Sequence, residues 1–192
     1  KPVSLNVSAS GRTAFVGTND GAFLVFDVTK REEPRLVKQM RFFESTIPLN
    51  HIVASLDGKI VMVGSRESDH IFVLSQRADE DYTIYGFIKM DGYILALSFA
   101  FHDNEMYASA VLSNNLLEVC RVPTTVSEDR TNPMNDEFCK KRCRKIDRGS
   151  NLIISSKLTK EIYITGEDKY LKQYDLWPSD TYENIDWRKP CI

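Results

Sequence analysis

Two groups of side chains in this sequence could hold a metal or carry redox chemistry: a pair of cysteines and the histidines. Cys139 and Cys143 lie four residues apart, whereas a structural zinc site takes four N or S ligands in a tetrahedral array. No second cysteine pair exists, and the histidines are far from this pair along the chain. The spacing also differs from the Cys-x-x-Cys of redox proteins. We therefore expect no metal and no cofactor. The histidines are His51, His70 and His102.

Catalysis would need an oriented nucleophile and an acid beside one of these histidines. His102 and Asp103 stand at a predicted junction between a strand and a turn, where a backbone hydrogen bond is the ordinary role of such a histidine. The chain contains no Gly-x-Ser-x-Gly elbow and no phosphate-binding glycine loop. The predicted inner strands begin with one histidine and no carboxylate. We predict no catalytic residues and no enzyme activity.

A basic run between residues 140 and 145 carries five cations in six residues and follows the acids 128–129 and 136–137. It could bind an acidic partner such as a tubulin tail or RNA, or act as a nuclear import signal. It could equally be a solvated loop, because residues 124–130 are polar and without apolar pattern. Aromatic side chains on which bases could stack are scarce nearby, so we do not expect nucleic acid. The candidate partner-binding residues are Lys140, Lys141, Arg142, Arg144 and Lys145.

A second candidate for partner binding is the tail after residue 177. Trp177-Pro178 ends the last predicted strand, since proline cannot continue a ladder. Tyr182, Ile185 and Trp187 then form an apolar set that could dock along the last repeat or on another subunit. The sequence leaves these two alternatives open.

Composition places the chain among ordinary globular proteins. Of its 192 residues 42% are hydrophobic and 27% charged, and the formal net charge is -2. This charge predicts no general affinity for nucleic acid or membrane, and no apolar run reaches the ~20 residues of a membrane span. Four cysteines are too sparse for a dense disulfide framework, so we expect a reducing compartment. The opening Lys1-Pro2 is already beside a strand-like run, and we expect a segment of a longer protein.

The elements that position these candidate groups belong to a sequence repeat. Gly11 and Gly58 are 47 residues apart, and so are Gly17 and Gly64. Each copy holds an alternating apolar run, a turn, a more continuously apolar run and a second turn. A period in the forties built of short strands is typical of propeller blades, which have four strands each.

The spacing predicts an all-β fold of about four blades of four-stranded antiparallel sheet, part of a larger propeller. A degenerate third copy has Asn104 in place of Gly11 and Ala110 in place of Gly17, and a fourth copy ends its second strand at Gly166. Aromatic residues on the outer strands are expected to pack between blades. The predicted segments are blades at 1–45 and 46–91, a degenerate blade at 92–123, a charged loop insertion at 124–150, a blade at 151–177 and a non-repeat tail at 178–192.

The pairs Phe26-Asp27 and Tyr174-Asp175 stand where the Trp-Asp dipeptide closes a WD-repeat blade, and Asp20 and Asp168 fit the turn acid of that pattern. The sequence thus resembles WD repeats, although no Gly-His dipeptide opens a blade. The ending from Trp177-Pro178 to Asp186-Trp187 also looks like the large WD-repeat cilia- and flagella-associated proteins of the axonemal tether or tether-head type.

That resemblance implies a non-catalytic scaffold of the ciliary or flagellar axoneme that links dynein-associated subunits to doublet microtubules. The implied partners are other axonemal WD-repeat proteins, dynein subunits and tubulin, with no membrane. The implied location is the cytoplasm, cytoskeleton and axoneme. Two alternatives stay open: a propeller subunit of an RNA-processing or trafficking complex, and a propeller-fold hydrolase.

Overall fold

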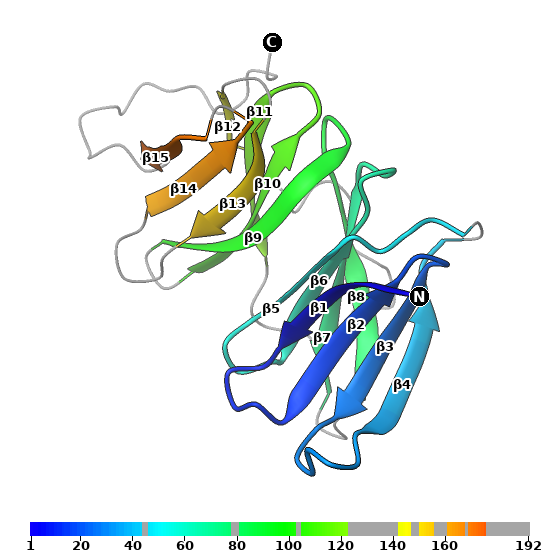
Figure 1. The fold of residues 1–192 in the computed structure, drawn as a ribbon. Coiled ribbons are helices and arrows are strands. Elements are labelled where there is room, and N and C mark those ends of the chain that lie inside the picture. The colour runs from blue at the N-terminus through cyan, green and yellow to red at the C-terminus, as the bar shows by residue number, and fades with distance from the viewer. Residues whose placement is uncertain are drawn as a thin grey trace. The chain divides into compact units, whose positions relative to one another are not determined.

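The computed structural model describes residues 1–43, 46–77, 81–102, 105–122, 142–146, 150–155, 161–167 and 169–175. The regular structure of these residues is all β, arranged as separate sheets that we call blades 1 to 4 in chain order (Figure 1). The chain divides into two compact units. Blades 1 and 2 belong to the first unit, whose main part ends at Ile94, and blades 3 and 4 belong to the second.

Blades 1 and 2 are four-stranded antiparallel meanders in which each strand pairs with the next along the chain. Short turns join the strands, which is why sequence neighbours become sheet neighbours. Blade 1 consists of β1 (Pro2–Val7), β2 (Thr13–Thr18), β3 (Ala22–Asp27) and β4 (Arg35–Arg41); blade 2 consists of β5 (His51–Ala54), β6 (Ile60–Gly64), β7 (His70–Gln76) and β8 (Tyr82–Lys89).

Blade 3 also has four strands, and the fourth comes from the basic run. The sheet order is β12-β11-β10-β9, and Arg142–Lys145 pairs antiparallel with β11. The expectation that all of 124–150 is a loop is therefore wrong at 142–145, because these residues pair antiparallel with β11. The strands of blade 3 are β9 (Ile94–His102), β10 (Glu105–Leu112), β11 (Leu116–Val122) and β12 (Arg142–Lys145).

Blade 4 contains three strands among the described residues, in the order β13-β14-β15. The strands are β13 (Ser150–Ser155), β14 (Glu161–Gly166) and β15 (Leu171–Asp175). The all-β, four-bladed fold predicted from the repeat is thus confirmed. The segment boundaries drawn between the blades stay a prediction.

The turn after the second strand fixes the register of the repeat. In each of the four blades the same backbone hydrogen bond closes this turn: an N–H donates to the carbonyl three residues earlier. The donors are Gly21, Ser68, Asn115 and Lys169. Asn115 and Lys169 take positive φ, as Gly21 does, so the conformation persists without glycine. Counted at this turn, blades 1, 2 and 3 repeat every 47 residues.

This register corrects the sequence alignment of the last two copies. The strand-ending carbonyls belong to Thr18, Ser65, Leu112 and Gly166. Gly17 therefore corresponds to Val111 and Thr165, one position away from the Ala110 and Gly166 chosen from the sequence. The sequence alignment matched small residues with one another, whereas the structural alignment follows the hydrogen-bonded turn.

Each unit has its own apolar core formed by two blades. In the first unit Phe15, Phe23 and Val25 of blade 1 pack on Ile52 and Val63 of blade 2. In the second unit Val111, Leu117 and Val119 of blade 3 pack on residues of blade 4, namely Ile153, Ile162, Ile164 and Tyr174.

Aromatic side chains join the two blades of the first unit. The ring of Phe42 stacks on Phe72 with centroids 4.9 Å apart, and Phe43 meets the same ring edge-on at 5.2 Å. Tyr82 packs edge-on against Phe15 at 5.5 Å, and its hydroxyl donates to the Gly58 carbonyl at 2.8 Å. The prediction that Phe42, Phe43 and Tyr82 pack between blades is confirmed.

Candidate interaction surfaces

The two faces of each blade have different roles in packing. Cross-strand pairing places Leu5, Val16 and Leu24 in one row across blade 1. We call the face that carries this row the leading face, and the opposite face, which carries Phe15 and Phe23, the trailing face. In both units the leading face of one blade packs on the trailing face of the blade before it.

The leading face of blade 1 is an exposed apolar surface. Leu5 is 66% exposed, and Val3 and Val7 on the same strand are 43% and 47% exposed. A shallow hollow of about 600 Å³ lies on this face, with Val16 and Phe26 among its lining residues. The sequence predicted that an open array of blades leaves outer sheet faces exposed, but it did not identify the residues of this face, whose signal was the alternation of apolar residues along β1.

Two side-chain hydrogen bonds in the first unit each tie a blade to the chain segment that follows it. Ser4 Oγ donates to the Leu49 carbonyl at 2.5 Å, at the approach to blade 2. His51, the register equivalent of Ser4, lies with Nε2 3.1 Å from the Ile94 carbonyl, so its ring donates to that oxygen. Desolvation lowers the pKa of His51 to about 4, and the nearby Arg66 charge acts in the same direction. A neutral, hydrogen-bonded histidine here is a structural link between chain segments.

The other histidines give no catalytic arrangement in the described residues. His70 Nδ1 lies 2.5 Å from Asp69 Oδ1, and its ring packs against Phe87 with centroids 5.2 Å apart. The side chain of His102 lies outside the described residues. Among the residues that the structure describes, no group of three His, Cys, Asp or Glu side chains is placed to hold a metal ion.

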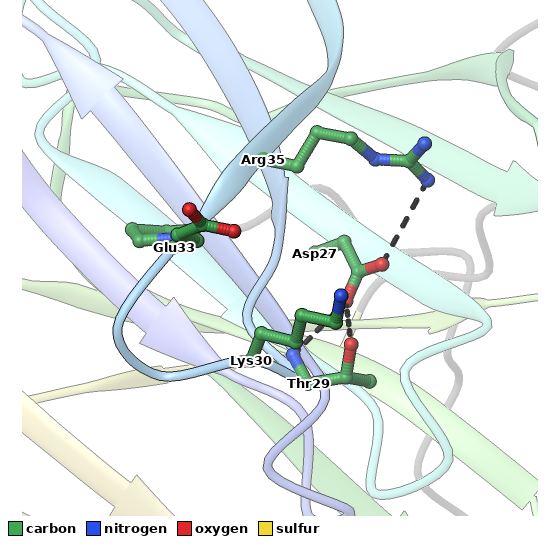
Figure 2. Close-up of a pocket in the computed structure, with 6 residues that line it drawn as sticks. Asp27, Thr29, Lys30, Glu33 and Arg35 are labelled. Carbon is green, nitrogen blue, oxygen red and sulfur yellow. Dashed lines mark hydrogen bonds and ion pairs between the residues drawn. The ribbon is translucent and has the colours of Figure 1, made fainter.

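A small pocket of about 410 Å³ lies at the turn between β3 and β4 (Figure 2). Asp27 Oδ1 accepts hydrogen bonds from the Thr29 hydroxyl at 2.6 Å and the Thr29 N–H at 2.9 Å, and Oδ2 lies 3.8 Å from Arg35. The Thr29 hydrogen bonds, followed by the charges of Arg35 and Lys30, lower the pKa of Asp27. The aspartate of the aromatic–Asp pair therefore stabilises its own turn.

The candidate partner-binding residues are only partly described. Arg142, Arg144 and Lys145 belong to β12, and Lys145 is exposed. Lys140 and Lys141 lie outside the described residues. So does the whole tail with Tyr182, Ile185 and Trp187.

The cysteines differ from the expectation of reduced thiols. Cys120 on β11 and Cys143 on β12 are both disulfide-bonded, and no described cysteine is free. Cys139 and Cys191 lie outside the described residues. Reduced thiols were expected from the sparse spacing of the cysteines along the sequence. That spacing does not show how strand pairing brings distant segments of the chain together.

No helix in the described residues is long and apolar enough to cross a bilayer.

The fold is that of part of a WD40 β-propeller. The chain superposes on the β-propeller domain of Myceliophteria thermophila Cps50 (Swd1) with a TM-score of 0.65 at 12% identity, over 91% of this chain and 53% of that one. It superposes on the RRP9 WD40 repeats with the same TM-score and identity, over 91% of this chain and 48% of that one. At this identity the likeness shows the fold alone.

In sequence, half of the chain is similar to cilia- and flagella-associated protein 43. It is 30% identical to the Xenopus laevis protein over 103 residues and 32% identical to the Mus musculus protein over 95 residues. The matches cover 50% of this chain and 6% of each relative. No family model matches.

Proposed function

We propose that this chain is a non-catalytic scaffold segment of a ciliary or flagellar assembly. The observation that carries the proposal is the similarity to cilia- and flagella-associated protein 43 in two vertebrates. The fold supports it, because rigid sheets joined by variable turns suit protein binding. The assembly is the axoneme, where the segment helps to link dynein-associated subunits to doublet microtubules.

A binding role without catalysis is consistent with the ionisable groups that are described. His51 is held neutral by burial and hydrogen-bonded to a backbone carbonyl. Asp20 and Asp27 are engaged by Arg41 and Arg35. These side chains stabilise turns and blade contacts. The rival hydrolase would need reactive groups assembled at one place.

Within this function, the basic run contacts the acidic partner and the apolar tail contacts a neighbouring subunit. Lys145 presents its charge on the outermost described strand of blade 3, where a flexible acidic tubulin tail can reach it. The proposal includes Lys140, Lys141, Arg142 and Arg144 in the same contact. Tyr182, Ile185 and Trp187 supply an apolar contact to a dynein-associated or WD-repeat subunit.

Location is the first test of the proposal. A tagged copy expressed in ciliated cells should lie along the axoneme, together with tubulin. The charge contact is tested separately by cosedimentation with microtubules before and after proteolytic removal of the acidic tubulin tails. Removal should lower the bound fraction several-fold, and the triple variant Lys140→Glu, Lys141→Glu, Lys145→Glu should do the same.

The matched control reverses Lys30 and Arg31, which are exposed on blade 1, and should leave microtubule binding unchanged. A tagged protein confined to nucleoli or vesicles would contradict the ciliary assignment and favour an RNA-processing or trafficking complex. RNA binding with a steep salt dependence would point to the first of these.

A further inference from the structure

We propose that Cys143 is a site of thiol–disulfide exchange with a low-molecular-mass thiol such as glutathione, and that its redox state decides whether β12 stays paired with β11. The starting observation is that Cys120 on β11 and Cys143 on β12 are both disulfide-bonded. The exchange site goes beyond the proposed function, from which only the reducing compartment is taken.

The disulfide-bonded state has a particular meaning in a reducing compartment. The glutathione and thioredoxin systems keep thiols reduced there, so disulfide bonds are rare, and those that form are usually transient and catalytic or redox-sensing. Bonded cysteines in a chain of such a compartment therefore indicate a reversible reaction more than a permanent crosslink.

The two sulfurs differ in their access to a reactant. Cys120 is 0% exposed, whereas Cys143 is half-buried. Among the described residues β12 is also the outermost strand of blade 3. A small thiol therefore reaches Cys143 more readily than Cys120. Arg142 and Arg144 flank Cys143 in the sequence, and cations beside a cysteine favour the thiolate, which is the form that exchanges.

The exchange takes two steps and transfers two electrons. The thiolate of the small thiol attacks a sulfur of the disulfide, the S–S bond breaks, and a mixed disulfide and a free cysteine form. A second small thiol then attacks the mixed disulfide. The two small thiols leave joined as their own disulfide, and their protons end on the two cysteine sulfurs. The oxidised small thiol of the same pool runs the reaction in reverse.

The sequence of β12 gives this strand little tendency to stay paired without a covalent bond. It has four residues, against seven in β11. Three of the four are cations, and short charged strands are typical of sheet edges that resist pairing. The exposed Lys145 adds little burial to hold the strand. The state of the sulfurs therefore has a large influence on whether β12 remains in the sheet.

The two ends of β12 are held in different ways. Directly after the strand, Ile146 is buried in the core of the second unit, and its N–H donates to the Asn115 carbonyl at 2.9 Å. Nearer the other end, Cys143 pairs across the two strands with Glu118, which is 0% exposed. Burying a carboxyl group costs solvation energy, which weakens noncovalent pairing at this position. Reduction therefore releases the strand around Cys143, while Ile146 keeps its C-terminal end attached.

The test is hydrogen exchange in the full-length protein, held in glutathione mixtures of graded reduced-to-oxidised ratio. Thiol alkylation and peptide mass spectrometry report the state of Cys143, and deuterium uptake by residues 142–145 reports the pairing of β12. Cys143 should be bonded in the oxidising mixtures and free at the reducing ratio of a cytosolic pool. On reduction the uptake by 142–145 should become about tenfold faster or more, as for local opening of a strand.

Two variants and an internal reference separate this opening from general unfolding. Cys143→Ser should show the fast uptake in every mixture, including the oxidising ones. The matched control Lys145→Ser changes an exposed residue of the same strand and should keep the redox dependence. Uptake by β10, which pairs with the other edge of β11, should be the same in both redox states.

Three results would each overturn the proposal: a Cys143 bond that survives the most reducing mixture, a Cys143 thiol that stays free in the most oxidising one, or equal uptake by 142–145 in both states. The measurement uses purified protein in defined buffers, whereas the ciliary assignment is scored by location in cells. Redox-dependent uptake in a protein that lies outside cilia would refute the proposed function and support the exchange site.

Discussion

Blades 1 and 2 are built on the same 47-residue register, yet their equivalent strands have different surroundings. All five residues of β6 are buried, whereas β2 has two half-buried positions. Ile52 in β5 is buried and its equivalent Leu5 in β1 is exposed. The difference teaches that apolar patterning prepares both leading faces for burial, while the presence of a neighbouring sheet determines which one is buried.

The largest expected effect comes from placing a charge at these equivalent positions. Ile52→Asp should lower the free energy of unfolding of the first unit by more than about 3 kcal/mol, because an ionised carboxylate would be buried against Phe15. Leu5→Asp should change it by no more than about 0.5 kcal/mol, as for a surface substitution. Urea unfolding of both variants measures the contrast. Equal losses would show that the two faces are buried alike in this chain.

A slightly smaller effect is expected at the close approach between blade 1 and the segment that enters blade 2. A Cβ on Gly17 would collide with the Leu49 carbonyl oxygen and Ser4 Oγ, so Gly17→Ala should cost about 2–3 kcal/mol. Gly11→Ala is the control: φ is +67° but the space around it is open, and the cost should be about 1 kcal/mol. Thermal unfolding of the two variants checks the order. A Gly17 variant as stable as the Gly11 variant would contradict the tight contact.

The pH dependence of stability distinguishes His51 from its equivalent Ser4. The folded-state pKa of His51 is about 4, below its ordinary 6.5, so the unfolded chain binds more protons between these values. The contribution of neutral His51 to the free energy of unfolding is complete above pH 6.5 and is lost as the pH falls towards 4. The loss between pH 7 and pH 5 is about 2 kcal/mol.

His51→Ser, which copies the residue of blade 1, should flatten this part of the curve of unfolding free energy against pH. Urea unfolding at several pH values gives both curves. An unchanged slope in the variant would assign the pH dependence to other groups.

The smallest effect concerns a feature that the two blades share. Ser8 and Ser55 are buried at the same turn, and each hydroxyl accepts the N–H of the residue five positions later, Thr13 or Ile60. Ser55 Oγ also donates to Asp57 Oδ1 at 2.6 Å. Ser8→Ala and Ser55→Ala should each cost about 1 kcal/mol, the usual value of one buried hydrogen bond. Chemical unfolding measures both variants. A loss of stability in only one of them would disprove the equivalence of the turns.

Much of the fold could be predicted from local patterns, because hairpin meanders place sequence neighbours side by side. The glycines at 11 and 58 marked turns of positive φ, and the alternating runs marked strands. The register of blades 3 and 4 was predicted one residue out, because the copies were aligned by small residues at Ala110 and Gly166, whereas the hydrogen-bonded turns begin at Leu112 and Gly166. Residues 142–145 were assigned to a loop, since pairing with β11 across a long insertion leaves no local signal.

The candidate surfaces were predictable to a smaller extent. The basic run and the apolar tail were found as departures from the repeat, and their roles stay predictions. An exposed outer sheet face was expected of an open array of blades, but the residues of the leading face of blade 1 were not identified, because they look like those of any half-buried strand. The disulfide-bonded state of Cys120 and Cys143 was not predicted either, because spacing along the chain does not show which thiols lie close together.

The sequence by itself determined the repeat, its turns and the two-faced character of each strand, because these follow from backbone conformation and from the period-2 alternation of side chains. The tertiary structure decided which faces are covered: Ile52 and Ile153 lie beneath a neighbouring sheet and Leu5 does not. The physical reason is that alternation fixes which residues share a face. Burial of that face depends on a second sheet, which the local sequence of the strand does not encode.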